Sequence, residues 1–142
     1  MNLAVFDTNV IVSGFLKPHG PPGRIVECLR QGSIRAALDD RIAGEYAEVL
    51  HRPAFDFPPG DVRIVLEAIR YHALSVDVPA SARAAGLPDL DDAPFLECAH
   101  AAGVPLVTGN TRHFPAKHRT GVRVMTPAEF MDLAASDPPA AE

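Results

Sequence analysis

The stretch LAVFDTN at residues 3–9 decides the fold, because a short and wholly apolar run passes directly into an acid. Leu3–Phe6 shows no alternation of polar and apolar residues, which is typical of a strand buried on both faces. Strands of this kind belong to parallel sheets covered by helices on both sides. Because sites in such folds form beyond the carboxyl ends of the strands, Asp7 stands where chemistry is expected.

Further apolar runs predict the remaining strands, which lie at Ile34–Leu38, Leu74–Val78, Leu106–Thr108 and Val122–Met125. Apolar residues at helical spacing fill the intervals, with stops at Gly32 and Gly103 and a capping box, TPAE, at 126–129. Alternating strands and helices predict an α/β fold, a three-layer α/β/α sandwich with a central parallel sheet. We expect one domain over residues 1–135 and a disordered tail at 136–142.

The composition is that of a soluble globular protein with an acidic balance. Of 142 residues, 47% are hydrophobic and 22% are charged, and 13 Lys and Arg against 18 Asp and Glu give a net charge of −5. Strong non-specific binders of nucleic acid are usually basic, so a nucleic-acid site here requires cation-holding carboxylates with arginines elsewhere. Without a membrane-length apolar run or a basic leader, the chain is expected to be cytoplasmic. Cys28 and Cys98 lack the spacing of a zinc site.

Acidic side chains follow the predicted strands. Asp39 and Asp40 are explained as caps of the helix that begins near Arg41. Glu45 flanks the apolar stripe of that helix and points toward the sheet edge, whereas Glu48 falls toward solvent. Taken alone, Asp7 is best explained as a turn or cap residue, and Glu45 is slightly better explained as a solvated helix residue.

A denser cluster of acids precedes the helix that contains Phe95. Asp89, Asp91 and Asp92 are more than helix capping needs, and like charges this close repel one another unless a cation relieves them. Asn110 ends the fourth predicted strand at the same edge. Clustered oxygen ligands suit Mg²⁺ or Mn²⁺ rather than zinc, and such ions promote phosphodiester hydrolysis.

Four segments resemble, in order, the motifs of PIN domains, the fold of VapC-like toxin ribonucleases. They are VFDTNVIVS at 5–13, EY at 45–46, DLDDAPFLECA at 89–99 and VTGNTRHF at 107–114. The resemblance covers residues 3 to about 130. Any one of the segments is unspecific, whereas four in order are fairly specific.

The resemblance implies a Mg²⁺- or Mn²⁺-dependent endoribonuclease, with RNA as substrate, a homodimeric state and a small antitoxin protein as partner. The implied catalytic residues are Asp7, Glu45, Asp92 and Asn110. The implied metal ligands are Asp7, Glu45 and Asp92, with Asp89 and Asp91 at the edge of the site. Thr8 and Asn9 are implied to support the first carboxylate. Many relatives have an acid where this chain has Asn110, so a one-metal and a two-metal site both stay open.

A basic run follows Asn110 and is expected beside the site. Arg112, Lys117 and Arg119 are its candidates for RNA contacts, with a solvated loop as the alternative.

Two other functions stay open. A PIN fold without catalysis would be an RNA- or protein-binding module, and Asn110 keeps this alternative in view. A haloacid-dehalogenase-like phosphatase also begins with an acid after its first strand, but its second acid would stand where this chain has Asn9. A response-regulator receiver would need an acidic pair that the first strand lacks.

Overall fold

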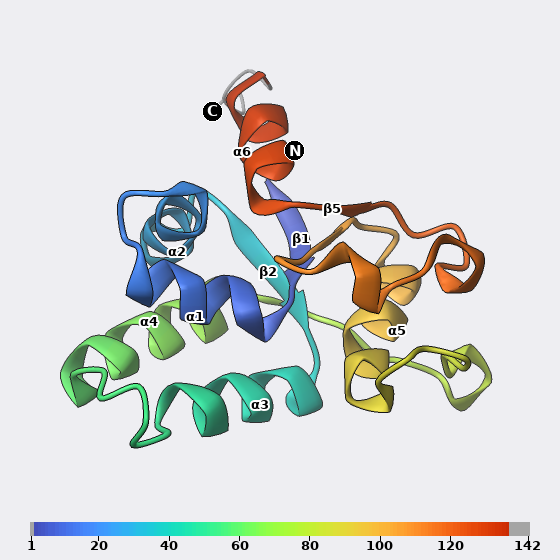
Figure 1. Ribbon diagram of the computed structural model, residues 1–142, viewed down its shortest axis with the longest axis horizontal. Coiled ribbons are helices and arrows are strands. Elements are labelled where there is room, and N and C mark those ends of the chain that lie inside the picture. Colours follow the sequence, from blue (N-terminus) through green and yellow to red (C-terminus); the bar gives the residue numbers. More distant parts are fainter. Residues whose placement is uncertain (1, 137–142) are drawn as a thin grey trace.

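The computed structural model describes residues 2–136, which form a parallel sheet with helices around it (Figure 1). The strands in this part of the chain are β1 (Leu3–Phe6), β2 (Arg35–Leu38), β3 (Leu74–Ser75), β4 (Leu106–Val107) and β5 (Val124–Met125). Their order in the sheet is β3-β2-β1-β4-β5, and every neighbouring pair is parallel. The first strand in sequence therefore lies at the centre, where its apolar residues are buried on both faces.

The helices are α1 (Thr8–Leu16), α2 (Pro21–Gln31), α3 (Asp40–Leu50), α4 (Pro59–His72), α5 (Ala93–Ala102) and α6 (Pro127–Ser136). Short 3₁₀ turns occur at Ala80–Ala82, Leu90–Asp92, Thr111–His113 and Ala116–His118. Helix α2 packs against α1, α4 and α6, while α5 packs against β1, β2 and β4. Figure 1 shows the strands between α2 and α5, so the layers are those of the predicted α/β/α sandwich.

Local signals in the sequence set the helix ends. Gly32 and Gly103 end α2 and α5 in the left-handed conformation, with φ of 83° and 67°, as expected of C-terminal glycines. At the start of α6, the Thr126 and Glu129 side chains each accept a hydrogen bond from the other residue's backbone N–H, at 3.2 Å and 3.0 Å. These predicted stops and the capping box are confirmed.

The structure differs from the expectations in some elements. Helix α1 was not predicted, because its run of valine and isoleucine lacks the polar spacing that marks an amphipathic helix. Three strands are shorter than their apolar runs, since β3, β4 and β5 each contain only two residues. Of the expected tail, Ser136 belongs to α6 and residues 137–142 lie outside the described residues. No helix between residues 2 and 136 is long and apolar enough to cross a membrane.

The register of the central strands determines which side chains meet at the carboxyl edge. Phe6 of β1 is paired with Val107 of β4, so the next residues along the two strands, Asp7 and Thr108, are neighbours across the edge. In Figure 1, β1 and β2 both end near the middle of the view, where the chain enters α1 and α3. This edge carries the candidate site.

Candidate active site

Asp7 is a buried carboxylate held in place at the end of β1. Its residue surface is 5% exposed, and the Thr108 hydroxyl donates a hydrogen bond to its Oδ2 at 2.8 Å. Burial raises the pKa of Asp7, while the Thr108 hydrogen bond and then the backbone N–H groups of Thr8 and Asn9 act to lower it. Asp7 is thus oriented by neutral donors, with no arginine or lysine paired to it among the residues described.

Asn9 links the start of α1 to the end of β4. Its Nδ2 donates to Asp7 Oδ2 at 3.2 Å and to Thr108 Oγ1 at 3.4 Å, and its Oδ1 accepts from the Gly109 backbone N–H at 2.9 Å. A side chain at Gly109 would stand 3.4 Å from Asn9 Oδ1, so this approach is tight. Asn9 thus contacts the first carboxylate, while its role in supporting a metal ligand stays a prediction.

Glu45 approaches Asp7 from α3. The Thr8 hydroxyl donates a hydrogen bond to Glu45 Oε2, and the neighbouring Tyr46 hydroxyl donates to the carbonyl of Phe6. Tyr46 is fully buried and ties α3 to the last residue of β1. The Thr8 side chain therefore donates to Glu45, the second carboxylate, whereas only the Thr8 backbone acts on Asp7, the first. Glu48 is exposed and paired with Arg52, as the helical spacing predicted.

Asp92 is the third acid at this edge, and it lies between the turn Leu90–Asp92 and α5. Its residue surface is 8% exposed, and its Oδ2 is buried without a hydrogen bond from the described chain. His113 Nδ1 lies 3.1 Å from that oxygen, which is ion-pair distance without the alignment of a hydrogen bond. A buried carboxylate oxygen without a donor is costly unless something else compensates it.

Asp7, Glu45 and Asp92, here called the carboxylate centre, influence one another electrostatically. Burial, and next the charge of Asp7, raise the pKa of Asp92 to about 6. Burial also raises the pKa of Glu45, and the charges of Asp7 and Asp91 add to the effect. The charge of Asp7 therefore opposes ionisation of Glu45 and of Asp92, and a cation at this edge would relieve that repulsion.

The remaining predicted acids and Asn110 occupy the margin of the centre. Asp89 and Asp91 are exposed, and Asp89 Oδ1 caps the backbone N–H of Asp91 at 2.9 Å. Asn110 is exposed and donates its backbone N–H to Thr108 Oγ1 at 3.1 Å. Within residues 2–136, no three His, Cys, Asp or Glu side chains are grouped closely enough to hold one metal ion. The three carboxylates share an edge without closing around one point.

The basic run does lie beside the centre, through His113. Arg112 and Lys117 are exposed, whereas Arg119 is half-buried and donates from Nε to the carbonyl of Phe114 at 2.7 Å. Arg112 and Lys117 are thus available to a ligand, while Arg119 stabilises its own loop.

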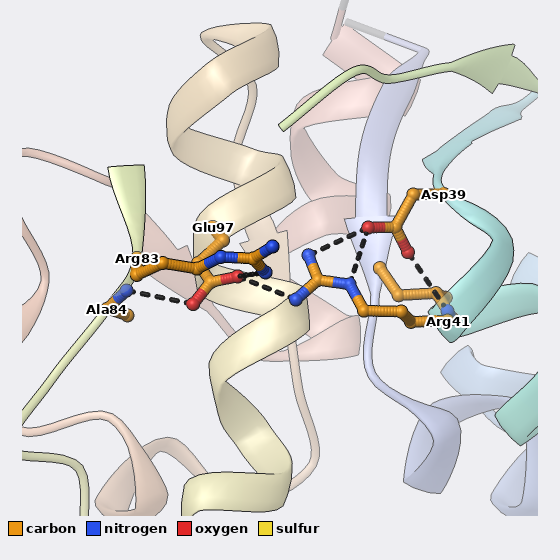
Figure 2. Close-up of polar contacts among 6 residues, drawn as sticks. Asp39, Arg41, Arg83, Ala84 and Glu97 are labelled. Atoms are coloured by element: carbon orange, nitrogen blue, oxygen red, sulfur yellow. Dashed lines mark hydrogen bonds and ion pairs between the residues drawn. The ribbon is translucent and has the colours of Figure 1, made fainter. Parts of the chain in front are cut away.

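A second polar cluster at the same edge was missed by sequence reasoning, which gave Arg41 no role. Glu97 of α5 is 3% exposed; its Oε1 accepts from Arg41 at 2.7 Å and Arg83 at 3.2 Å, and its Oε2 accepts from the Ala84 backbone N–H at 2.8 Å. Arg41 also donates from Nε to Asp39 at 2.8 Å, and Asp39 accepts from the Ile42 backbone N–H at 3.1 Å, so its predicted cap is confirmed. Figure 2 shows Glu97 between Arg83 and Arg41, with Asp39 on the far side of Arg41. We call these residues the arginine–glutamate network.

One signal could have revealed this network. Glu97 is the only charged residue in a helix segment whose neighbours Phe95, Leu96, Cys98 and Ala99 are all buried. A carboxylate in such surroundings requires a cationic partner. The identity of that partner, 56 positions away in sequence, is not encoded in local periodicity.

Comparison with known proteins gives one family. A family model described as the PIN domain matches residues 4–112, which is most of the chain. No curated protein matches the sequence. The matched range includes Asp7, Glu45 and Asp92 and ends at Arg112.

Proposed function

The chain belongs to the PIN domain family, whose members are generally nucleases, and from this premise we propose that it is a Mg²⁺- or Mn²⁺-dependent endoribonuclease. The single observation that carries the proposal is the carboxylate centre, in which the charge of Asp7 raises the pKa of Glu45 and of Asp92 and the buried Asp92 Oδ2 has no hydrogen-bond donor among the described residues. Family membership leaves the phosphatase alternative without support.

The donor set of the centre fits a hard divalent cation. Asp7, Glu45 and Asp92 offer carboxylate oxygens only, which is the chemistry that Mg²⁺ and Mn²⁺ prefer. When bound, such an ion lowers the pKa of water and neutralises charge that develops on a phosphodiester. Asp89 and Asp91 are proposed to contribute carboxylate oxygens at the exposed margin. Asn110 is proposed to contribute a neutral amide oxygen.

The residues of the chain have distinct parts in this scheme. Thr108 and Asn9 hold Oδ2 of Asp7 at the end of β1, and Thr8 holds Glu45. These neutral donors orient the carboxylates without cancelling their charge, so the attraction for a cation is kept. His113 is the cationic candidate nearest to Asp92 and marks the side from which the basic run could meet a phosphate.

The direct test of the proposal is cleavage of RNA with and without divalent metal. Wild-type protein should cleave single-stranded or structured RNA with added Mn²⁺ or Mg²⁺ and stop when a chelator is added. The alternative, a non-cleaving PIN-fold module that binds RNA or protein, is favoured by the open arrangement of the acids in residues 2–136. RNA binding without metal-dependent cleavage would establish that alternative.

The basic run is proposed to bind the substrate backbone. Replacing Arg112 and Lys117 by alanine should weaken RNA binding and reduce its salt dependence by about one unit of slope for each phosphate that is no longer neutralised. Arg63→Ala, at an exposed position of α4, removes one positive charge outside the basic run and should leave the slope unchanged. An unchanged slope in the Arg112/Lys117 variant would assign these residues to a solvated loop.

The toxin role is a finer proposal that follows from the resemblance to VapC-like ribonucleases. It requires a small antitoxin protein that blocks cleavage, and it implies a homodimer of this chain. Co-purification of the chain with the product of a short adjacent reading frame, and loss of RNA cleavage in that complex, would support the role. Wild-type activity in the presence of that product would contradict it.

A further inference from the structure

The three acids of the carboxylate centre come from separate elements, and two of them are held by direct contacts. Asp7 and Glu45 are connected through Thr8, which follows Asp7 and donates to Glu45, and through the Tyr46 hydroxyl on the carbonyl of Phe6. The Asp92 side chain has no such link: its ion-pair contact among the described residues is with His113, in the turn Thr111–His113. Packing on the sheet places α5, so a polar connection between the start of α5 and α3 has to come from other residues.

The arginine–glutamate network provides that connection. Arg41 lies one helical turn before Glu45 on α3, and Glu97 lies five residues after Asp92 on α5. Their 2.7 Å ion pair therefore joins the turn of α3 that leads to Glu45 with the part of α5 that follows Asp92. Arg41 also forms an ion pair with Asp39, which directly follows β2. Through Arg41, both helices are therefore connected to the sheet.

The same carboxylate also fixes the chain on the other side of Asp92. Arg83 and the Ala84 backbone N–H bind Glu97 from the segment that leads into Asp89–Asp92. Asp92 is thereby restrained from both directions along the sequence. Because Glu97 is almost fully buried and its two oxygens accept three hydrogen bonds, it has little freedom to serve as a ligand or as a proton carrier itself.

We infer that Glu97 and Arg41 are positioning residues that set the separation of Glu45 and Asp92 and so fix the affinity of the centre for a divalent cation. This inference rests on the proposed function. Neither residue touches the cation or the substrate; both act through the helices that carry the ligands. Loss of residues that orient metal ligands typically lowers metal affinity by about 10- to 100-fold.

The test is direct Mn²⁺ binding, measured from the electron paramagnetic resonance signal of free Mn²⁺ at a temperature where every variant is folded. Glu97→Gln keeps the shape and an acceptor for Ala84 but removes the charge, and Arg41→Gln removes the other half of the pair from a half-exposed position. Each should raise the dissociation constant for Mn²⁺ by about 10-fold. The double variant should be no weaker than the single ones, because both break one connection.

Two matched controls separate positioning from loss of charge. Arg83→Gln removes a longer and more exposed contact but leaves the Ala84 N–H on Glu97 and the ion pair between α3 and α5 in place, so it should raise the dissociation constant by about twofold or less. Glu48→Gln removes an exposed acid of α3 that is the weakest of the charges acting on Glu45, so the dissociation constant should change by less than about twofold. The dissociation constant of Arg41→Lys should lie between those of the wild type and Arg41→Gln, because lysine lacks the forked guanidinium that contacts Asp39 and Glu97 at once.

The outcomes distinguish the positioning role of Glu97 and Arg41 from the proposed nuclease function. Wild-type affinity in folded Glu97→Gln and Arg41→Gln proteins, whatever their melting temperatures, would overturn the positioning role and leave the nuclease proposal standing. If wild-type protein itself failed to bind Mn²⁺, and Asp7→Asn behaved identically, the proposed function would fall and this inference with it.

Discussion

The carboxylate centre and the arginine–glutamate network are both built from buried and half-buried acids at one sheet edge, but they differ in what opposes the negative charge. In the network, Asp39 and Glu97 face two arginines, so acidic and basic charges balance. In the centre, Asp7 and Glu45 accept hydrogen bonds from hydroxyl and amide donors. Asp92 has one histidine nearby. The charges of the network are thus compensated within the chain, whereas the proposed function assigns the compensation of the centre to a cation supplied from outside.

The largest expected difference concerns cleavage. Asp7→Asn retains the hydrogen-bonding shape of the side chain but removes a ligand charge, so metal-dependent RNA cleavage should fall by about 100-fold or more. Glu48→Gln, an exposed charge change, should leave the rate unaltered. Folding of both proteins is checked by circular dichroism. A folded Asp7→Asn protein with the wild-type rate would remove Asp7 from the centre.

The next effect is on the free energy of unfolding, which substitutions in the two regions should change in opposite directions. Glu97→Ala leaves two arginines and a backbone N–H without their shared acceptor, so unfolding free energy should fall by about 2 kcal/mol. The melting temperature in chelator should drop by roughly 6 °C. Asp7→Asn should instead raise it, because repulsion is relieved. An unchanged melt for Glu97→Ala would show that the network does not stabilise the fold.

A smaller effect is the pH dependence that Asp92 gives to the metal-free protein. Its folded pKa of about 6 lies above the ordinary value of 3.8, so the folded state binds the proton more tightly than the unfolded state. Ionised Asp92 therefore lowers the free energy of unfolding by its full amount above pH 6, and this destabilisation disappears as pH falls toward 4. Between pH 7 and pH 5, in chelator, wild-type protein should gain about 1 kcal/mol relative to Asp92→Asn. A stability difference between the two proteins that is independent of pH would contradict the burial and repulsion assigned to Asp92.

The smallest expected effect is that of Asn110→Asp. This side chain is exposed at the margin of the centre, so an added charge there acts through screened solvent. The Mn²⁺ concentration for half-maximal cleavage should fall by about twofold, consistent with a weak surface charge interaction. A tenfold fall would place Asn110 against the cation and favour a second metal position, whereas an increase would contradict its place at the site.

The sequence predicts the sheet and its edge better than it predicts the partners across that edge. Asp7 was placed correctly because the apolar run Leu3–Phe6 is unambiguous, and the carboxyl ends of parallel strands share one side of a sheet. The roles of Thr8 and Arg41 could not be predicted, because each depends on a contact with an acid 37 or 56 residues away. Periodicity shows which face of an element is buried, but it does not show which distant side chain meets it.

The central claim, that the carboxylate centre is completed by a divalent cation, is tested most directly by melting wild-type and Asp92→Asn proteins in chelator and again in millimolar Mn²⁺. In chelator, Asp92→Asn should melt higher, because a buried and repelled charge is removed. In Mn²⁺ the order should reverse, because the ion stabilises only the folded state that binds it, and the wild type binds it better. A wild-type melting temperature that does not respond to Mn²⁺, or an Asp92→Asn protein that gains as much as the wild type, would contradict the claim.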